Sequence, residues 1–89
     1  MRRPYLEVTF RKGRPIAAHL YLPRQSGARV ARTVEMRPHG QVDYATSGEA
    51  IGVELTAPTL VEIADLNEVL GKIGAPRLEA EDLRPLRAA

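Results

Sequence analysis

Apolar and polar residues alternate strictly at the start of the chain. The apolar members of this alternation are Leu6, Val8 and Phe10. A period of two is typical of a strand with one buried face, so we predict a strand over about residues 5–11. Gly13 then favours a turn, because glycine tolerates positive φ. A second alternating run predicts a strand over about 16–22, whose expected buried face holds Ile16, Ala18, Leu20 and Leu22.

Three further strands follow. The segment "RVARTVEM" predicts a third strand with Val30, Val34 and Met36 on one face, interrupted by Arg32. A long basic side chain is tolerated there if its stem lies over the core and its guanidinium reaches water. The segments "QVDYA" and "EAIGVEL" predict a fourth and a fifth strand around the turn "TSG".

The last hairpin contains two carboxylates, Asp43 and Glu54. If Tyr44 pairs with Ile51 so that the apolar residues share a face, Asp43 lies opposite Gly52. The carboxylates are then diagonal neighbours roughly 7 to 8 Å apart on the solvent face. Three interpretations are open: a catalytic pair, a plain hairpin, or a contact surface. We favour the plain hairpin, because catalytic pairs need burial or tight coupling.

After Pro58 the period changes to about 3.6, which predicts a helix over about 60–73. Its apolar stripe holds Leu60, Ile63, Leu66, Leu70 and Ile73. Capping-box spacings occur at Thr59 with Glu62 and at Asp65 with Glu68, and Gly74 provides a stop. For the tail, 75–89, we consider a short helical turn near 80–87, disorder, or docking on a neighbouring molecule through Leu83 and Leu86.

These elements define an α+β fold in one domain over residues 1–89. The sheet, about 5–57, is expected to be a small antiparallel meander of about five strands, with one C-terminal helix packed on one face. A chain of 89 residues with one Phe, three Tyr and no Trp must build its core from aliphatic residues. Such a small core favours an oligomer in which subunits share buried surface.

Several classes of chemistry find no support in the sequence. The chain has no cysteine, and its two histidines, His19 and His39, lack the spacing of a metal site. Ser26 and Ser47 lie in turn sequences and not in a nucleophile elbow. We therefore expect no catalytic residues, no cofactor and no metal. The N-terminus lacks the apolar run of a signal peptide, and no stretch is long enough to span a membrane, so we expect a cytoplasmic protein.

The charge is distributed unevenly. Residues 1–37 contain nine Arg or Lys against two Glu, a net charge of +7, whereas residues 38–89 carry −5. The two halves either neutralise each other or attract partners of opposite charge. Arg2 and Arg3 add to a group of candidate phosphate contacts: Arg11, Lys12, Arg14, Arg24 and Arg29. Nucleic acid is therefore a possible partner, although no recognition helix or stacking platform accompanies these charges.

The order of the strand segments resembles a small bacterial family of domains of unknown function, numbered twenty-two eighty-three. The matching pieces are "HLYL" at 19–22, "VARTVE" at 30–35, and "VDY" through Gly48 to "IGVEL" at 51–55. The chain departs from the family where an acidic segment is replaced by the basic "RKGRPIAAH" and where Thr56 and Ala57 follow the last strand. The resemblance implies a small sheet without assigned catalytic residues. Some relatives lie beside genes for small toxin-like proteins, which implies an antitoxin-like binding role.

We therefore expect a non-enzymatic protein-interaction module that self-associates, as a dimer, or binds a small protein partner. The candidate contact residues are Tyr5, His19 and Tyr21, which share one sheet face. Tyrosine is favoured at interfaces because it combines apolar area with a hydroxyl. The alternative is a nucleic-acid-binding or antitoxin-like regulator that uses the N-terminal arginines.

Overall fold

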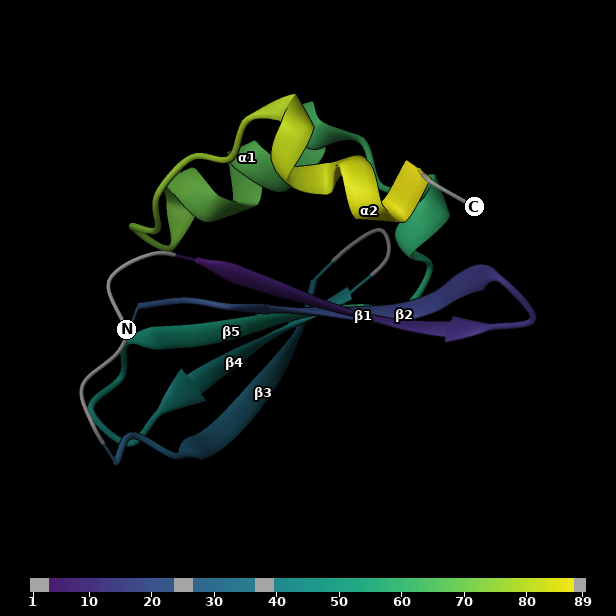
Figure 1. Ribbon diagram of the computed structural model, residues 1–89. Coiled ribbons are helices and arrows are strands. Elements are labelled where there is room, and N and C mark those ends of the chain that lie inside the picture. The colour runs from purple at the N-terminus through teal and green to yellow at the C-terminus, as the bar shows by residue number, and fades with distance from the viewer. Residues whose placement is uncertain (1–3, 24–26, 37–39, 88–89) are drawn as a thin grey trace.

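The structure is a computed structural model that describes residues 4–23, 27–36 and 40–87. It has two layers, a five-stranded antiparallel sheet and a layer of short helical segments that covers one face of the sheet (Figure 1). The strands are β1 (Tyr5–Arg11), β2 (Arg14–Tyr21), β3 (Val30–Met36), β4 (Gly40–Ala45) and β5 (Ala50–Leu55). The helical segments are η1 (Pro58–Leu60), α1 (Ile63–Lys72), η2 (Ala80–Leu83) and α2 (Arg84–Arg87). The predicted α+β class is confirmed.

The predicted meander is wrong. The strand order is β1-β2-β5-β4-β3, so β5 is inserted between β2 and β4. β5 is the most apolar strand, with Ile51, Val53 and Leu55 fully buried, and a central position buries it best. β3 carries exposed polar residues and lies at the edge. Connecting β2 to β3 crosses three strand spacings, about 14 Å, which the eight residues 22–29 can span.

The register of the β4–β5 hairpin agrees with the prediction at its centre. Asp43 lies opposite Gly52, and Gly48 takes the positive φ of 94° in the turn. A bulge between Asp43 and Tyr44 changes the register beyond this point, so that Tyr44 pairs with Ala50 and not with Ile51 as predicted. The hairpin therefore keeps Asp43 over a residue without a side chain.

Because of a second bulge, the buried face of β2 differs from the predicted one. The register of β1 against β2 shifts between Thr9 and Phe10, which places Pro15 opposite Phe10. Pro15 is consequently buried, whereas Ile16, predicted in the core, is exposed. Alternation also fails at edge strand β3: Val30 and Val34 are exposed there, and the Arg32 guanidinium lies 4.5 Å from the centre of the Tyr44 ring.

The single predicted helix is replaced by several shorter segments. The chain is extended at Val61 and Glu62, so α1 begins at Ile63 and not near residue 60, and its N-cap is Glu62 and not Thr59 or Asp65 as the capping-box spacings predicted. A capping box occurs instead between Glu79 and Asp82, at the start of η2. The end of α1 is as predicted, because Gly74 has φ of 73° and the Ala75 amide donates to the Leu70 carbonyl.

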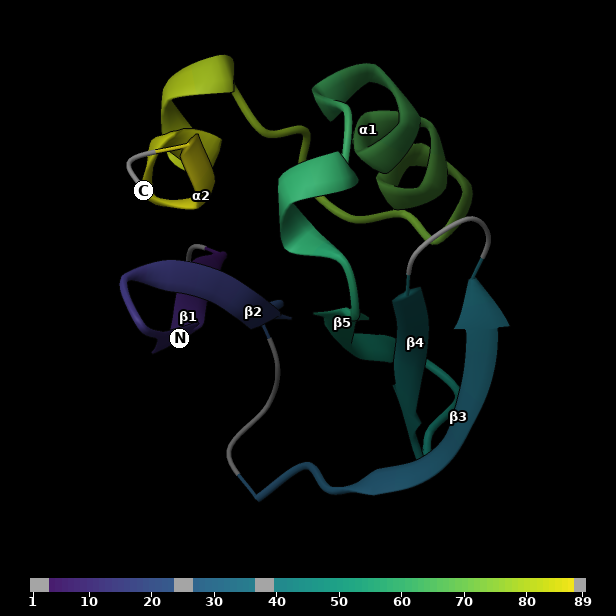
Figure 2. The same cartoon turned by 90° about the vertical axis from the view of Figure 1, so that its right-hand side faces the viewer.

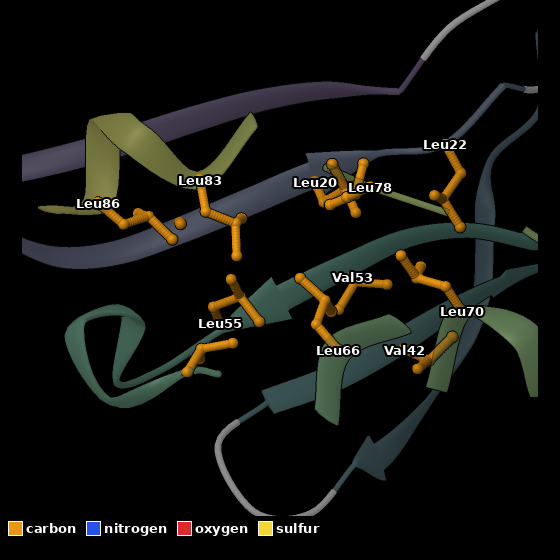
Figure 3. Close-up of a cluster of buried hydrophobic side chains, with 12 residues drawn as sticks. Leu20, Leu22, Val42, Val53, Leu55, Leu66, Leu70, Leu78, Leu83 and Leu86 are labelled. Atoms are coloured by element: carbon orange, nitrogen blue, oxygen red, sulfur yellow. The ribbon is translucent and has the colours of Figure 1, made fainter. Parts of the chain in front are cut away.

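The tail belongs to the core of this chain. Figure 3 shows Leu78, Leu83 and Leu86 among the leucines and valines of the sheet and of α1. Of the three alternatives considered for the tail, the short helical turn near 80–87 is confirmed as η2 and α2. Docking of Leu83 and Leu86 on a neighbouring molecule is wrong, because both are buried within this chain. Asn67 of α1 joins the tail through two hydrogen bonds, one to the carbonyl and one from the amide of Leu78, at 2.9 and 2.8 Å.

No helix among the described residues is long and apolar enough to cross a membrane.

Candidate functional site

The face of the sheet opposite the helices carries the polar and aromatic side chains. Figure 2 shows α1 and α2 on one side of the strands, which leaves the other side without a helical layer in the described chain. Leu20 and Val53 point into the core, so alternation directs their neighbours His19, Gly52 and Glu54 to the helix-free face. The candidate partner contacts Tyr5, His19 and Tyr21 lie on this face, together with Asp43 and Glu54.

Asp43 of β4 is the one charged side chain that is buried in the described part of the chain, with only 4% of its surface exposed. Its Oδ1 accepts a hydrogen bond of 2.7 Å from the Thr33 hydroxyl of β3, the residue directly opposite in the sheet. A buried carboxylate is costly unless hydrogen bonds or an opposite charge compensate it. Asp43 and Glu54 are diagonal neighbours in the sheet, as predicted. The predicted exposure of Asp43 to solvent is wrong, because its carboxylate is buried.

Gly52 of β5 makes room for two functional groups. A Cβ at this position would lie 2.7 Å from His19 Nε2 and 3.5 Å from Asp43 Oδ2. The imidazole from β2 and the carboxylate from β4 thus extend over the same glycine from opposite sides. No other residue type leaves this space open.

Glu54 completes the cluster. Its Oε1 lies 3.8 Å from His19 Nδ1, and its side chain is 44% exposed. One ligand-capable atom each from His19, Asp43 and Glu54 lies within 4.8 Å of the others. An imidazole between two carboxylates can hold a proton or, together with them, a metal cation.

The sequence-based prediction of no metal ligands missed this cluster because it relied on spacing along the chain. His19, Asp43 and Glu54 come from three strands, and only the insertion of β5 between β2 and β4 makes them neighbours. In a meander, β2 would lie between β1 and β3, away from both carboxylates. The one sequence feature that could have indicated the cluster was the predicted pairing of Asp43 with Gly52, because a glycine leaves room for another side chain beside the carboxylate.

The three predicted partner contacts lie in one row on this face. The rings of Tyr5 and Tyr21 are stacked with centroids 5.1 Å apart, and those of Tyr21 and His19 are 4.2 Å apart. The Tyr21 hydroxyl donates a hydrogen bond of 3.2 Å to Glu7 on β1. Tyr5, on edge strand β1, is 54% exposed. The row therefore runs from the buried carboxylate to the edge of the sheet.

The predicted phosphate contacts do not form one surface. Arg11, Lys12 and Arg14 gather at the tip of the β1–β2 hairpin. Arg29 precedes β3 and lines a hollow beside the β4–β5 turn with Ser47 and Glu49, near the opposite end of β2. The remaining basic and polar candidates, Arg2, Arg3, Arg24, Ser26 and His39, lie outside the described residues.

The chain matches no protein-family model, no curated protein and no solved structure. The resemblance to family twenty-two eighty-three therefore stays a prediction from its short motifs.

Proposed function

We propose that this chain is a non-enzymatic protein-interaction module that forms a homodimer through the helix-free face of its sheet. The observation that carries the proposal is the row of Tyr5, Tyr21 and His19, in which Tyr5 is exposed and the other two side chains are half-buried. Stacked aromatic rings offer a rigid, amphipathic surface that loses little conformational entropy on binding. The absence of cysteine suits the reducing cytoplasm, where we expect the module to act.

Two further features favour a second copy as the partner. The aromatic row ends at β1, which is an edge strand of the sheet in the described part of the chain. A pair of identical faces related by a twofold axis would extend this row across both subunits, and twofold dimers are the commonest assembly of soluble proteins. The opposite charges of the two halves of the chain, +7 and −5, also permit attraction between copies.

Sedimentation equilibrium over a range of concentrations tests the proposal. We expect the mass of the wild-type chain to rise from 9.8 kDa toward twice that value. The double variant Tyr5→Ser with Tyr21→Ser should remain a monomer. The matched control is Leu60→Ser, which removes an exposed apolar side chain from η1, away from the proposed interface. A wild-type chain that stays monomeric, or a tyrosine variant that dimerises normally, would refute the dimer.

The alternative function, nucleic-acid binding, has its own outcome. If the wild-type chain is monomeric but binds an oligonucleotide at low salt, the hairpin tip becomes the relevant surface. Substituting Arg11, Lys12 and Arg14 with Ser should then weaken the binding and reduce its dependence on salt. With fewer basic side chains at the phosphates, binding releases fewer counterions from the nucleic acid.

A further inference from the structure

We infer that His19, Asp43 and Glu54 form a binding site for a divalent transition-metal cation such as Zn²⁺. The three side chains come from β2, β4 and β5, which are adjacent in the sheet, and their ligand atoms lie within 4.8 Å of one another. All three ligands belong to one chain, so the site does not require the proposed dimer.

The buried carboxylate is the first reason to place a cation here. Asp43 is 4% exposed, and within the described residues only its Oδ1 accepts a hydrogen bond, from Thr33. Its Oδ2 lies over Gly52 on the side of His19 and accepts none from the described part of the chain. A buried carboxylate needs compensation by hydrogen bonds or by an opposite charge, and a cation beside Oδ2 supplies that charge.

The glycine beneath the cluster is the second reason. A Cβ at Gly52 would meet His19 Nε2 at 2.7 Å, so any larger residue would displace the imidazole from its position near Asp43. Gly52 has no positive φ that would demand glycine for backbone reasons. Its lack of a side chain therefore serves the approach of His19 and Asp43.

The ligand set indicates the class of metal. Imidazole nitrogen combined with two carboxylates suits Zn²⁺ and similar transition metals, whereas Ca²⁺ and Mg²⁺ prefer oxygen alone. Ligand atoms about 2.1 Å from a shared ion lie at most about 4.2 Å apart, so binding requires the cluster to close slightly. Glu54, with 44% of its side chain exposed, is free to make that movement.

A bound cation competes with a simpler arrangement. A protonated His19 between Glu54 and Asp43 would also supply positive charge, since Nδ1 is already 3.8 Å from Glu54 Oε1. A titration distinguishes the two arrangements. Only the metal site binds one transition-metal ion per chain and changes the visible absorption spectrum of that ion.

The experiment is a titration of the full chain, free of any affinity tag, with Zn²⁺ by calorimetry and with Co²⁺ by visible absorption. We expect one ion per chain and a Co²⁺ spectrum of low coordination number. His19→Ala and Glu54→Gln should each weaken binding by at least about 10-fold, because replacing even a group that only supports a ligand costs about 10- to 100-fold.

Two control variants separate this site from other binding. His39→Ala removes the only other histidine of the chain. Glu7→Gln removes a carboxylate of the same sheet face that is not part of the cluster. Both should bind as the wild type does, and circular dichroism should show that every variant is folded. Absence of binding by the wild-type chain would overturn the inference, as would His19→Ala or Glu54→Gln binding like the wild type. Because sedimentation reports dimerisation separately, either proposal can fail alone.

Discussion

Gly52→Ala is the substitution that tests the arrangement of the site most directly. The added methyl group would lie 2.7 Å from His19 Nε2, whereas ordinary contacts begin at 3.4 Å, so the imidazole must move by at least about 0.7 Å. The centroid of the Tyr21 ring lies 4.2 Å from that of His19, which restricts movement in that direction. Overpacking of this kind typically costs about 1 to 3 kcal/mol. We expect the lower part of this range, because His19 lies on a partly open face.

Urea unfolding measures the loss of stability, and NMR chemical shifts of the His19 and Tyr21 ring protons report the displacement. Gly71→Ala is the matched control: no heavy atom other than its own helix and chain neighbours lies within 4 Å of a Cβ there, and the position is an exposed one in α1. That control should be stabilised by about 0.5 to 1 kcal/mol. A Gly52→Ala chain with wild-type stability and unchanged ring shifts would show that β5 does not lie between His19 and Asp43.

Two further substitutions test individual contacts. Thr33→Val removes the hydrogen bond of 2.7 Å to Asp43 but keeps a β-branched side chain, and should cost about 1.5 to 3 kcal/mol in urea unfolding. In an Asp43→Asn background the cost should fall to about 0.5 to 1.5 kcal/mol, because the hydroxyl then donates to a neutral acceptor, and an equal cost there would contradict our account of the buried charge. Asn67→Ala removes both hydrogen bonds to Leu78 and should cost about 1 to 3 kcal/mol. Hydrogen exchange should then accelerate in residues 75–83, and unchanged protection would refute the role of Asn67 in holding the tail.

Local sequence features predicted the elements and some of their ends. Apolar patterns and turn residues located all five strands, and Gly74 marked the end of α1. The requirement that the apolar residues share a face, met by pairing Tyr44 with Ile51, placed Asp43 opposite Gly52 correctly, although Tyr44 itself pairs with Ala50. The errors in residue pairing within the two hairpins arose where the backbone departs from regularity. Bulges beside Phe10 and Tyr44 shifted the pairing by one residue, and alternation alone does not reveal a bulge.

The extent of the core was also decided by packing between distant segments. Docking of Leu83 and Leu86 on a neighbour was one of the alternatives for the tail, because Pro85 argued against a long helix there. In the structure both are buried in the hydrophobic core, where α2 contacts η1 and η2. Asn67 fixes the segment between α1 and η2 by its hydrogen bond to Leu78. These two residues are 11 positions apart, so no local sequence pattern predicts their interaction.

The sequence by itself determined the α+β class, the strand segments, and the shared face of Tyr5, His19 and Tyr21, because these depend on residues that are neighbours along the chain. Only the tertiary structure decided that β5 lies between β2 and β4. The position of a strand in the sheet depends on which strand gains most from being central and fully buried. This requires the burial of all five strands to be compared, and no single segment of the sequence contains that information. The cluster of His19, Asp43 and Glu54 exists only as a consequence of this strand order, since strands about 4.8 Å apart bring together side chains that are far apart in sequence.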